Sequence, residues 1–358
     1  MKLVMSRTVV SAAIIVLSLF MLLWRAKIAG KGEFFDNYFP VSQTRSIKGI
    51  CAVFILFSHM CPYLGDTFTA LFTFKYVGAI MVAAFFLVSG YGLQYGIMNK
   101  ENYLKGFLGK RMLSIAVPFY IINIFYIVSG PMDTKSILIS LTGYNVWFVM
   151  AIAIFYAGFY ICNRLLSKNV AMVAITVFTL LYMLVMNRLH MGFWWYNSCL
   201  LFPAGIWLCR YSGAFVKFFK KHCLLKTLLL VAVVVICYAY YCIHSGMADT
   251  SLTMLAMSVL TTVSFGVMLA VLSMKVQLKN PILDFFGDMS LEIYLTHALW
   301  IGLLRSEFCL NLAPAFFGND VVYLVGILVG TIVMSMLSHK VSGLILKLIL
   351  RKPENKQP

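Results

Sequence analysis

Long apolar runs alternate with short polar linkers along almost the whole chain. About eleven runs are close to the roughly 20 residues that a helix needs to cross a bilayer. Within each run the apolar residues are continuous, which at this length is typical of a membrane helix. The pattern predicts an all-α polytopic membrane protein with about eleven transmembrane helices, at 8–24, 49–65, 76–97, 112–130, 145–163, 170–186, 193–210, 224–243, 252–274, 285–304 and 321–346.

Composition supports this interpretation and divides the chain. Hydrophobic residues make up 62% and charged residues 11% of the 358 residues, far from the averages of soluble domains. The first run is longer than the apolar part of a signal peptide and is followed by Trp-Arg-Ala-Lys, a poor cleavage site. We expect a membrane anchor helix and linker at 1–40, a transmembrane core at 41–346 and a cytoplasmic basic tail at 347–358.

The net charge of +17 is distributed unevenly across the predicted spans. With eleven spans, 23 of the 29 Lys and Arg residues fall on one side. Because cytoplasmic loops of membrane proteins are enriched in Lys and Arg, this predicts an outside N-terminus and a cytoplasmic C-terminus in the plasma (inner) membrane. The charge therefore indicates topology, and no nucleic-acid partner is expected. The basic linkers are 25–48, 98–111, 164–169, 210–226 and 275–284, with the tail from residue 340.

The nine Cys residues show no paired spacing, so we expect no disulfide framework and no metal site. The chain also contains neither a Walker loop nor the glycine fingerprint of dinucleotide-binding proteins.

Lys48 and His59 are the most informative polar residues in the predicted spans. Eleven residues separate their positions, about three helical turns, so the two share one helix face about 16 Å apart. Ionisable residues inside a span usually face a cavity or a partner and carry function. His59 is therefore a candidate for chemistry, with Lys48 at a membrane boundary. The alternatives are a histidine packed against another helix and a lysine that only follows the positive-inside rule.

Three further stretches carry polar or small residues. Ser89 and Gly90 lie late in the third run, where small residues permit close approach of a helix or of a ligand. The next linker carries four cations, which suit either phosphate groups or lipid headgroups: Lys100, Lys105, Lys110 and Arg111. In the tenth run, the spacing of Ser290, Tyr294 and His297 predicts one polar helix stripe, with Glu292 on the opposite face.

Together these segments resemble, in order, the motifs of the membrane-bound acyltransferase-3 family, the integral membrane O-acyltransferases. Lys48, Gly49 and His59 are similar to that family's basic residue and histidine on the first core span. The family usually has Arg where this chain has Lys48, and Arg45 is the alternative for that role. The other similar segments are Phe85–Tyr91, Lys110-Arg111 through Pro118, Trp147-Phe148-Val149, and Ser290, Tyr294, Leu295 and His297.

The resemblance implies a ten-helix core preceded by one added helix. It also implies transfer of an acyl group, commonly acetyl, from cytoplasmic acyl-CoA to a hydroxyl of a cell-surface or lipid-linked carbohydrate. Acetyl-CoA is then the expected donor, and a glycan acceptor and membrane lipid are the expected partners. The implied catalytic residues are His59 and His297. The implied donor-binding residues are Lys48, Arg45, Ser89, Gly90, Lys105, Lys110 and Arg111, and the implied acceptor-binding residues are Ser290, Tyr294, Glu292 and Trp147.

A multi-span transporter or flippase for a glycan or a small solute is the alternative function. Polar stripes and intramembrane histidines also suit proton-coupled transport. Transporters often contain internal repeats, and the two halves of this chain show no convincing similarity to each other. The ordered motifs therefore favour the acyltransferase.

Overall fold

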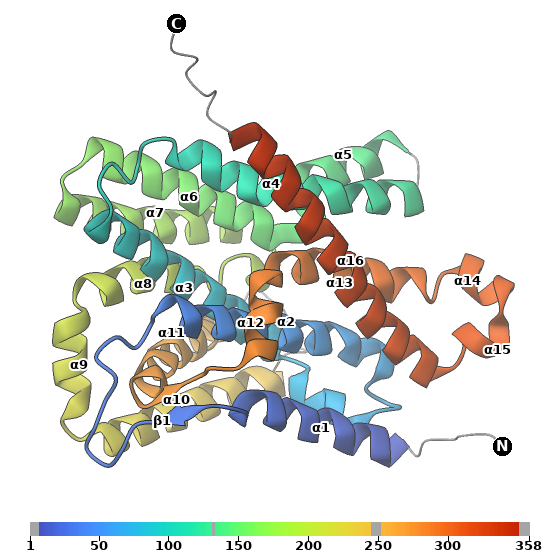
Figure 1. The fold of residues 1–358 in the computed structure, drawn as a ribbon, viewed down its shortest axis with the longest axis horizontal. Coiled ribbons are helices and arrows are strands. Elements are labelled where there is room, and N and C mark those ends of the chain that lie inside the picture. The colour runs from blue at the N-terminus through green and yellow to red at the C-terminus, as the bar shows by residue number, and fades with distance from the viewer. Residues whose placement is uncertain (1–6, 131–132, 245–251, 351–358) are drawn as a thin grey trace, which may run out of the picture. The chain divides into compact units, whose positions relative to one another are not determined.

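The computed structural model describes residues 7–130, 133–244 and 252–350, and most of these are helical (Figure 1). Eight helices of this described part are long and apolar enough to cross a membrane. The prediction of an all-α polytopic membrane protein is therefore confirmed. The eight are α2 (Val41–Leu64), α3 (Val77–Asn99), α4 (Phe107–Ser129), α6 (Trp147–Leu165), α7 (Lys168–Arg188), α10 (Cys223–His244), α11 (Leu252–Lys275) and α16 (Asp320–Leu350).

The count of eleven is not confirmed, because three predicted spans do not correspond to one of these eight helices. The first, 8–24, is found as the helix α1 (Arg7–Leu23), which at 17 residues is shorter than the eight. The run 285–304 is divided between α12 (Pro281–Asp288) and α13 (Ser290–Leu303). Met289, between them, has φ −110° and ψ 26°, outside helical geometry, although it is apolar and the hydropathy pattern continues through it.

The predicted span 193–210 consists of a 3-10 helix, η3 (Phe193–Trp195), a turn, and the ten-residue helix α8 (Leu201–Arg210). Polar side chains in the turn bond to other parts of the chain. The Asn197 amide donates to Ser258 Oγ at 2.9 Å, and the Ser198 hydroxyl donates to the Ala79 carbonyl at 3.1 Å. These bonds are tertiary and attach the turn to α11 and to α3.

Shorter helices connect the long ones, and several have side-chain caps. These are η1 (Thr69–Phe74), α5 (Thr134–Thr142), η2 (Tyr144–Val146), α9 (Ser212–Lys220), α14 (Glu307–Leu312) and α15 (Pro314–Phe317). Asp133 accepts the Ser136 N–H at 3.0 Å at the start of α5. Asn280 accepts the Ile282 N–H at 2.9 Å before α12, where Pro281 occupies the first turn. Such caps satisfy amides that the helix itself leaves unbonded.

The described chain divides into two compact units. Unit 1 comprises Met1–Tyr103 and Gly158–Ser290, and unit 2 comprises Leu104–Ala157 and Leu291–Pro358, each without the undescribed residues. The predicted anchor segment 1–40 and tail 347–358 include residues 1–6 and 351–358, which lie outside the described residues.

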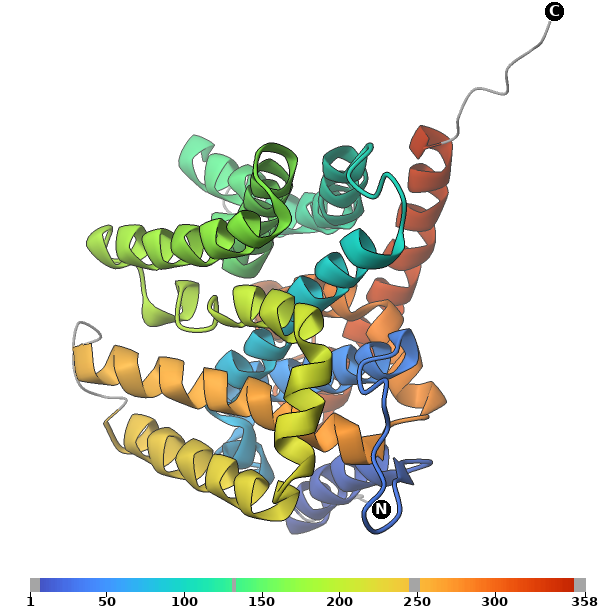
Figure 2. The same cartoon turned by 90° about the vertical axis from the view of Figure 1, so that its left-hand side faces the viewer.

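In unit 1, α3 and α8 cross at two glycines. A Cβ added at Gly90 would clash with the Phe202 carbonyl oxygen and lie 3.0 Å from its carbon. A Cβ added at Gly205 would clash with the Leu87 carbonyl oxygen and lie 2.8 Å from the Tyr91 nitrogen. The two backbones are therefore in direct contact, as at small-residue interfaces in membranes. Elsewhere in unit 1, α10 and α11 lie side by side (Figure 2).

A two-residue sheet joins the segment after α1 to the end of α11. The strands β1 (Lys27–Ile28) and β2 (Val276–Gln277) are antiparallel, with Lys27 opposite Gln277. The Ala29 N–H donates to the Lys275 carbonyl at 2.9 Å and continues this attachment. The linker that precedes α2 is therefore hydrogen-bonded to the core of unit 1.

In unit 2, α13 and α16 run antiparallel, with contacts distributed along both helices. The Thr296 and Ser335 hydroxyls are 2.9 Å apart, and the Tyr323 hydroxyl donates to the Ile301 carbonyl at 2.8 Å. From α4, the Tyr126 hydroxyl donates to the Leu295 carbonyl at 3.0 Å. These bonds fix the position of α13, which carries several of the candidate site residues.

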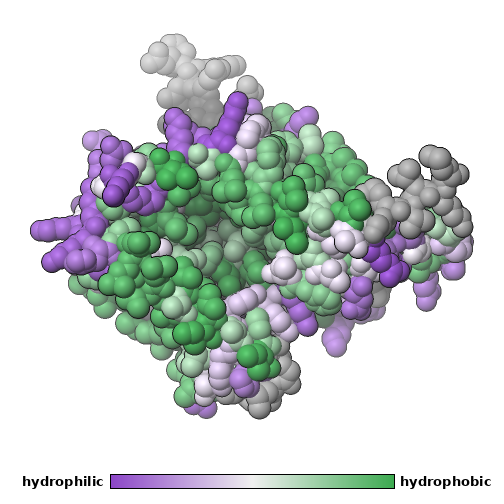
Figure 3. All heavy atoms as spheres, turned by 90° about the horizontal axis from the view of Figure 1, so that it is seen from below, coloured by the Kyte–Doolittle hydropathy of each residue, from purple (hydrophilic) through white to green (hydrophobic). Residues whose placement is uncertain are grey.

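The surface is apolar where the chain is expected to meet lipid. On α10, exposed leucine and isoleucine side chains follow one another along the helix: Leu224, Leu225, Leu228, Leu229 and Ile236. Figure 3 shows one face of the molecule on which apolar side chains predominate over hydrophilic ones. Exposed apolar area on this scale is rare on soluble monomers and indicates contact with hydrocarbon.

Candidate functional site

The helix α2 carries both Lys48 and His59, as the sequence predicts. Because the helix continues without interruption from Val41 to Leu64, the two positions are separated by about 16 Å of helical rise. Lys48 is half-buried, and His59 has an exposed side chain although its neighbours Ser58 and Met60 are buried. The imidazole is therefore accessible from outside the packed core of unit 1.

The start of α2 is held by close contact with α12. A Cβ at Gly49 would clash with the Leu283 carbonyl oxygen and lie 3.0 Å from the Gly287 nitrogen. Gly287 in turn meets the Arg45 backbone, where a Cβ would lie 2.8 Å from the carbonyl carbon. The glycine that follows Lys48 thus permits backbone contact between α2 and α12, which sets the position of Lys48.

The structure gives Arg45 a partner that sequence reasoning did not identify. Arg45 Nε lies 2.9 Å from Asp288 Oδ1 at the end of α12, with both side chains partly exposed. The neighbouring Ser46 hydroxyl donates to Asp284, also on α12. Arg45 therefore joins α2 to α12, and its positive charge is compensated within the protein.

Ser89 and Gly90 lie side by side on α3. Ser89 is half-buried, and Gly90 is buried at the crossing with α8. Because the Phe202 carbonyl occupies the space beside Gly90, helix packing accounts for this glycine.

The predicted basic segment leads into α4 in unit 2. Lys105 and Lys110 are exposed, and Gly106 between them has φ +67°, a left-handed conformation that favours glycine. The Arg111 guanidinium is 5.9 Å from the Phe107 ring centroid and 6.0 Å from that of Tyr156. Arg111 is therefore held against aromatic rings, whereas the two lysines extend into solvent.

The candidate residues of α13 lie in a buried region. Ser290, Tyr294 and His297 are all less than 10% exposed. The rings of Tyr294 and His297 are 5.9 Å apart, and Tyr294 also meets Phe148 with ring centroids 5.5 Å apart. Trp147, half-buried at the start of α6, lies against Phe148 in turn. Sequence positions far apart in unit 2 are thus brought together into one aromatic and polar cluster.

His297 is bonded to the backbone of its own helix. Its Nδ1 lies 3.1 Å from the Ile293 carbonyl oxygen, which can only accept a hydrogen bond, so Nδ1 is the donor.

Glu292 has a partner on α16. Its buried carboxylate lies 2.9 Å from His339 Nδ1, and the His339 side chain is half exposed. The sequence analysis placed Glu292 on the face opposite the stripe and did not identify His339, which is 47 residues away, as its partner. No signal in the sequence identifies this pair.

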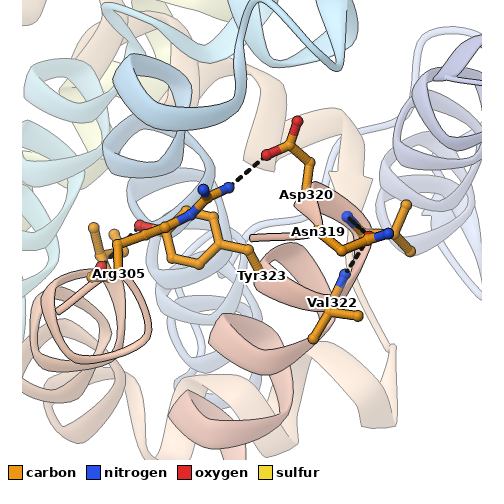
Figure 4. Close-up of polar contacts among 7 residues, drawn as sticks. Arg305, Asn319, Asp320, Val322 and Tyr323 are labelled. Carbon is orange, nitrogen blue, oxygen red and sulfur yellow. Dashed lines mark hydrogen bonds and ion pairs between the residues drawn. The ribbon is translucent and has the colours of Figure 1, made fainter. Parts of the chain in front are cut away.

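A second polar cluster that sequence reasoning missed joins the end of α13 to the start of α16. Arg305 forms an ion pair with Asp320, and its guanidinium lies 4.4 Å from the Tyr323 ring centroid (Figure 4). Asn319 accepts the Val321 and Val322 amides and caps α16. The Arg305 contacts therefore join the two helices, and the Asn319 contacts stabilise the start of α16.

The candidate residues thus form two sets. Unit 1 holds Arg45, Lys48, His59, Ser89 and Gly90, and also Ser290 as the first residue of α13. Unit 2 holds Lys105, Lys110, Arg111, Trp147, Glu292, Tyr294 and His297. Within the described residues, no group of three or more His, Cys, Asp or Glu side chains is placed to hold a metal ion.

The long apolar helices define a multi-pass membrane protein. The polar residues within them are the candidate catalytic and binding residues. A family model for the acyltransferase domain matches residues 45–340, which include every candidate site residue. The chain therefore belongs to the acyltransferase-3 family. Comparisons with curated proteins and with solved structures give no match.

Proposed function

We propose that this membrane acyltransferase transfers an acetyl group from cytoplasmic acetyl-CoA to a hydroxyl of a cell-surface or lipid-linked carbohydrate. The observation that carries this proposal is the match of the acyltransferase domain over residues 45–340. The alternative of a transporter without covalent chemistry has no comparable support.

Unit 1 offers a half-buried cation and an accessible imidazole on one helix face. In the proposal, Lys48 contacts a phosphate of the donor at the cytoplasmic side, and the pantetheine arm extends along α2 towards His59. The separation of about 16 Å along the helix leaves room for an extended arm between the two residues. Lys105, Lys110 and Arg111 supply further positive charge for the donor phosphates.

His59 is the proposed general base. Its imidazole removes the proton of the acceptor hydroxyl while the oxygen attacks the thioester carbonyl carbon. The tetrahedral intermediate then collapses, the carbon–sulfur bond breaks, and the departing CoA sulfur takes the proton from the imidazolium. The products are the acyl ester and CoA with a free thiol. A two-step route through an acyl-histidine gives the same products.

In the proposal, the polar side chains on α13 act on the acceptor and on the thioester carbonyl oxygen. Ser290, Tyr294 and His297 would orient the acceptor or stabilise the negative charge that develops on the carbonyl oxygen. Glu292 and Trp147 are proposed to contact the carbohydrate. The contacts between Tyr294, His297 and Phe148 support this assignment, because packed rings hold polar atoms in a fixed arrangement.

The test uses the full chain in nanodiscs with radiolabelled acetyl-CoA and a membrane glycan extract. Wild type, His59→Ala and His244→Ala are compared for thioester consumption and for label on glycan or protein. His244 is a suitable control because it lies on α10 in the same unit, and its Nδ1 bonds to the Tyr240 carbonyl of its own helix.

We expect consumption by wild type and His244→Ala, and at least a hundredfold loss in a folded His59→Ala protein. Label that stays on wild-type protein would identify the covalent route. Near-normal transfer by His59→Ala would exclude the proposed base. Absence of both binding and turnover in wild type would favour the transporter.

A further inference from the structure

Unit 1 contains an apolar pocket that none of the proposed catalytic or donor-binding residues lines. Its volume is about 640 Å³, within the range of roughly 300–1,000 Å³ that small-molecule sites occupy. The walls come from α3, α7, α8, α9 and α11. Leu87, Leu201 and Val267 are among the aliphatic side chains that line it.

The pocket opens at an aromatic rim. The exposed fractions of Trp207, Tyr211 and Phe218, which line it, are 36%, 49% and 60%. Trp207 and Tyr211 stack with ring centroids 5.7 Å apart, and the Trp207 indole N–H donates to Thr176 at 3.0 Å. Because this bond satisfies the indole, the pocket presents almost no unpaired polar group and suits a hydrocarbon chain. Trp and Tyr also gather where membrane proteins meet lipid headgroups.

Positive charge is concentrated next to this rim. The stretch from 210 to 226 contains no acidic residue and five cations: Arg210, Lys217, Lys220, Lys221 and Lys226. The Lys226 ammonium lies 3.5 Å from the centroid of the Phe218 ring, which lines the pocket, and donates to the Phe218 carbonyl. Lys220 is 3.6 Å from Asp36, so one cation of the set is paired within the protein.

The helix α9 displays both properties on different faces. Ala214, Phe215 and Phe218 line the pocket, whereas Lys217 and Lys220 are exposed in the same helix. A short amphipathic helix of this kind, with lysines beside aromatic residues, is typical of segments that lie in the membrane interface.

We propose that this pocket binds one acyl chain of an anionic phospholipid, with the lipid phosphate beside Lys217 and Lys226. A lipid chain gains little by leaving hydrocarbon for an apolar protein wall, so the pocket alone would not select a lipid. The charge next to the rim supplies the selectivity. The basic linkers are expected on the cytoplasmic side, where membrane leaflets carry anionic headgroups. The proposed site is independent of acyl transfer.

Native mass spectrometry of the purified full chain, titrated with phosphatidylglycerol or phosphatidylcholine, tests the proposal. Wild type should retain phosphatidylglycerol about tenfold better than phosphatidylcholine. Lys217→Gln and Lys226→Gln should each weaken retention of phosphatidylglycerol about fivefold, the effect of removing one basic residue near a membrane surface. Lys279→Gln is the matched control, because it removes an exposed lysine of the same unit that lies outside the basic stretch 210–226 and should leave retention unchanged.

A second variant tests the pocket itself. Ala214 is exposed on α9 and lines the pocket, so Ala214→Trp should place an indole in it without disturbing a buried position and should reduce retention of phosphatidylglycerol at least fivefold. Equal retention of both lipids by wild type would overturn the proposal. So would equal losses in Lys217→Gln and Lys279→Gln, or full retention by a folded Ala214→Trp protein. Displacement of phosphatidylglycerol by a lower concentration of polyprenyl phosphate would overturn the identity of the ligand.

Discussion

The crossing of α3 and α8 gives a prediction in which packing and function can be separated. Gly90→Ala adds one methyl group at the contact with the Phe202 carbonyl, whereas Gly92→Ala adds the same group two residues further along α3. A Cβ at Gly92 would meet nothing within 4 Å. The two variants therefore make the same chemical change on one helix, and only one of them meets a neighbouring backbone.

The magnitude follows from the available space. At Gly90 the new carbon would lie 3.0 Å from the Phe202 carbonyl carbon and closer still to its oxygen, inside the 3.4–4 Å of ordinary contact. Backbone atoms cannot rotate aside, so the helices must separate, and overpacking of this kind costs about 1–3 kcal/mol. Replacing a helical glycine by alanine itself stabilises by roughly 0.5–1 kcal/mol, which is the only effect expected for Gly92→Ala.

Thermal unfolding of the detergent-solubilised protein should show a lower midpoint for Gly90→Ala than for wild type and an equal or higher one for Gly92→Ala. The donor affinity of each folded variant is then measured from the dependence of acyl transfer on donor concentration, at a temperature well below both midpoints. If Gly90 serves packing alone, both folded variants retain the donor affinity of wild type. Wild-type stability of Gly90→Ala would refute the close backbone contact, and a selective loss of donor affinity would restore the donor-binding role.

Substitutions at three other polar contacts give further predictions. Arg45→Gln and Asp288→Asn should each change the unfolding free energy by only about 0–1 kcal/mol, because their ion pair is exposed. The KM for acetyl-CoA then decides the role of Arg45, since an increase in Arg45→Gln alone would show that it contacts the donor rather than only α12. His339→Leu leaves the buried Glu292 carboxylate without its partner and should destabilise by about 1–3 kcal/mol, whereas Glu292→Gln should cost less; equal shifts in thermal unfolding would contradict this order. Tyr126→Phe removes a hydrogen bond to the α13 backbone and should cost about 1 kcal/mol in the same assay, and no change would show that the bond contributes nothing.

Hydropathy predicts the long helices well because their apolar composition extends over the full span. The predicted run 76–97 corresponds to α3, Val77–Asn99, and 252–274 corresponds to α11, Leu252–Lys275. The run 193–210 was wrong as a single helix, because the hydrogen bonds of Asn197 to Ser258 and of Ser198 to α3 are tertiary. An average of apolar character along the chain contains no information about such partners.

For the candidate site, local spacing was informative and distant partners were not. Tyr294 and His297, three residues apart, have adjacent rings on α13 as helical geometry predicts. The pairing of Arg45 with Asp288, by contrast, depends on how α12 packs against α2. The same holds for Glu292, whose partner on α16 is determined by the register of two antiparallel helices. The catalytic and binding roles remain predictions.

The division of the chain into two interleaved units has a consequence for biosynthesis. The helix α4 emerges from the ribosome early, but α16, against which it packs, begins only at Asp320. Unit 1 can be completed first, because its last segment ends at Ser290. Within unit 2, Asn123 of α4 donates to the Ser140 carbonyl of α5 and is satisfied at once. The surface of α4 that later meets α16 remains in contact with lipid until α16 has been synthesised, and a chain stalled before α16 would present that surface to the membrane proteases that remove unfinished proteins.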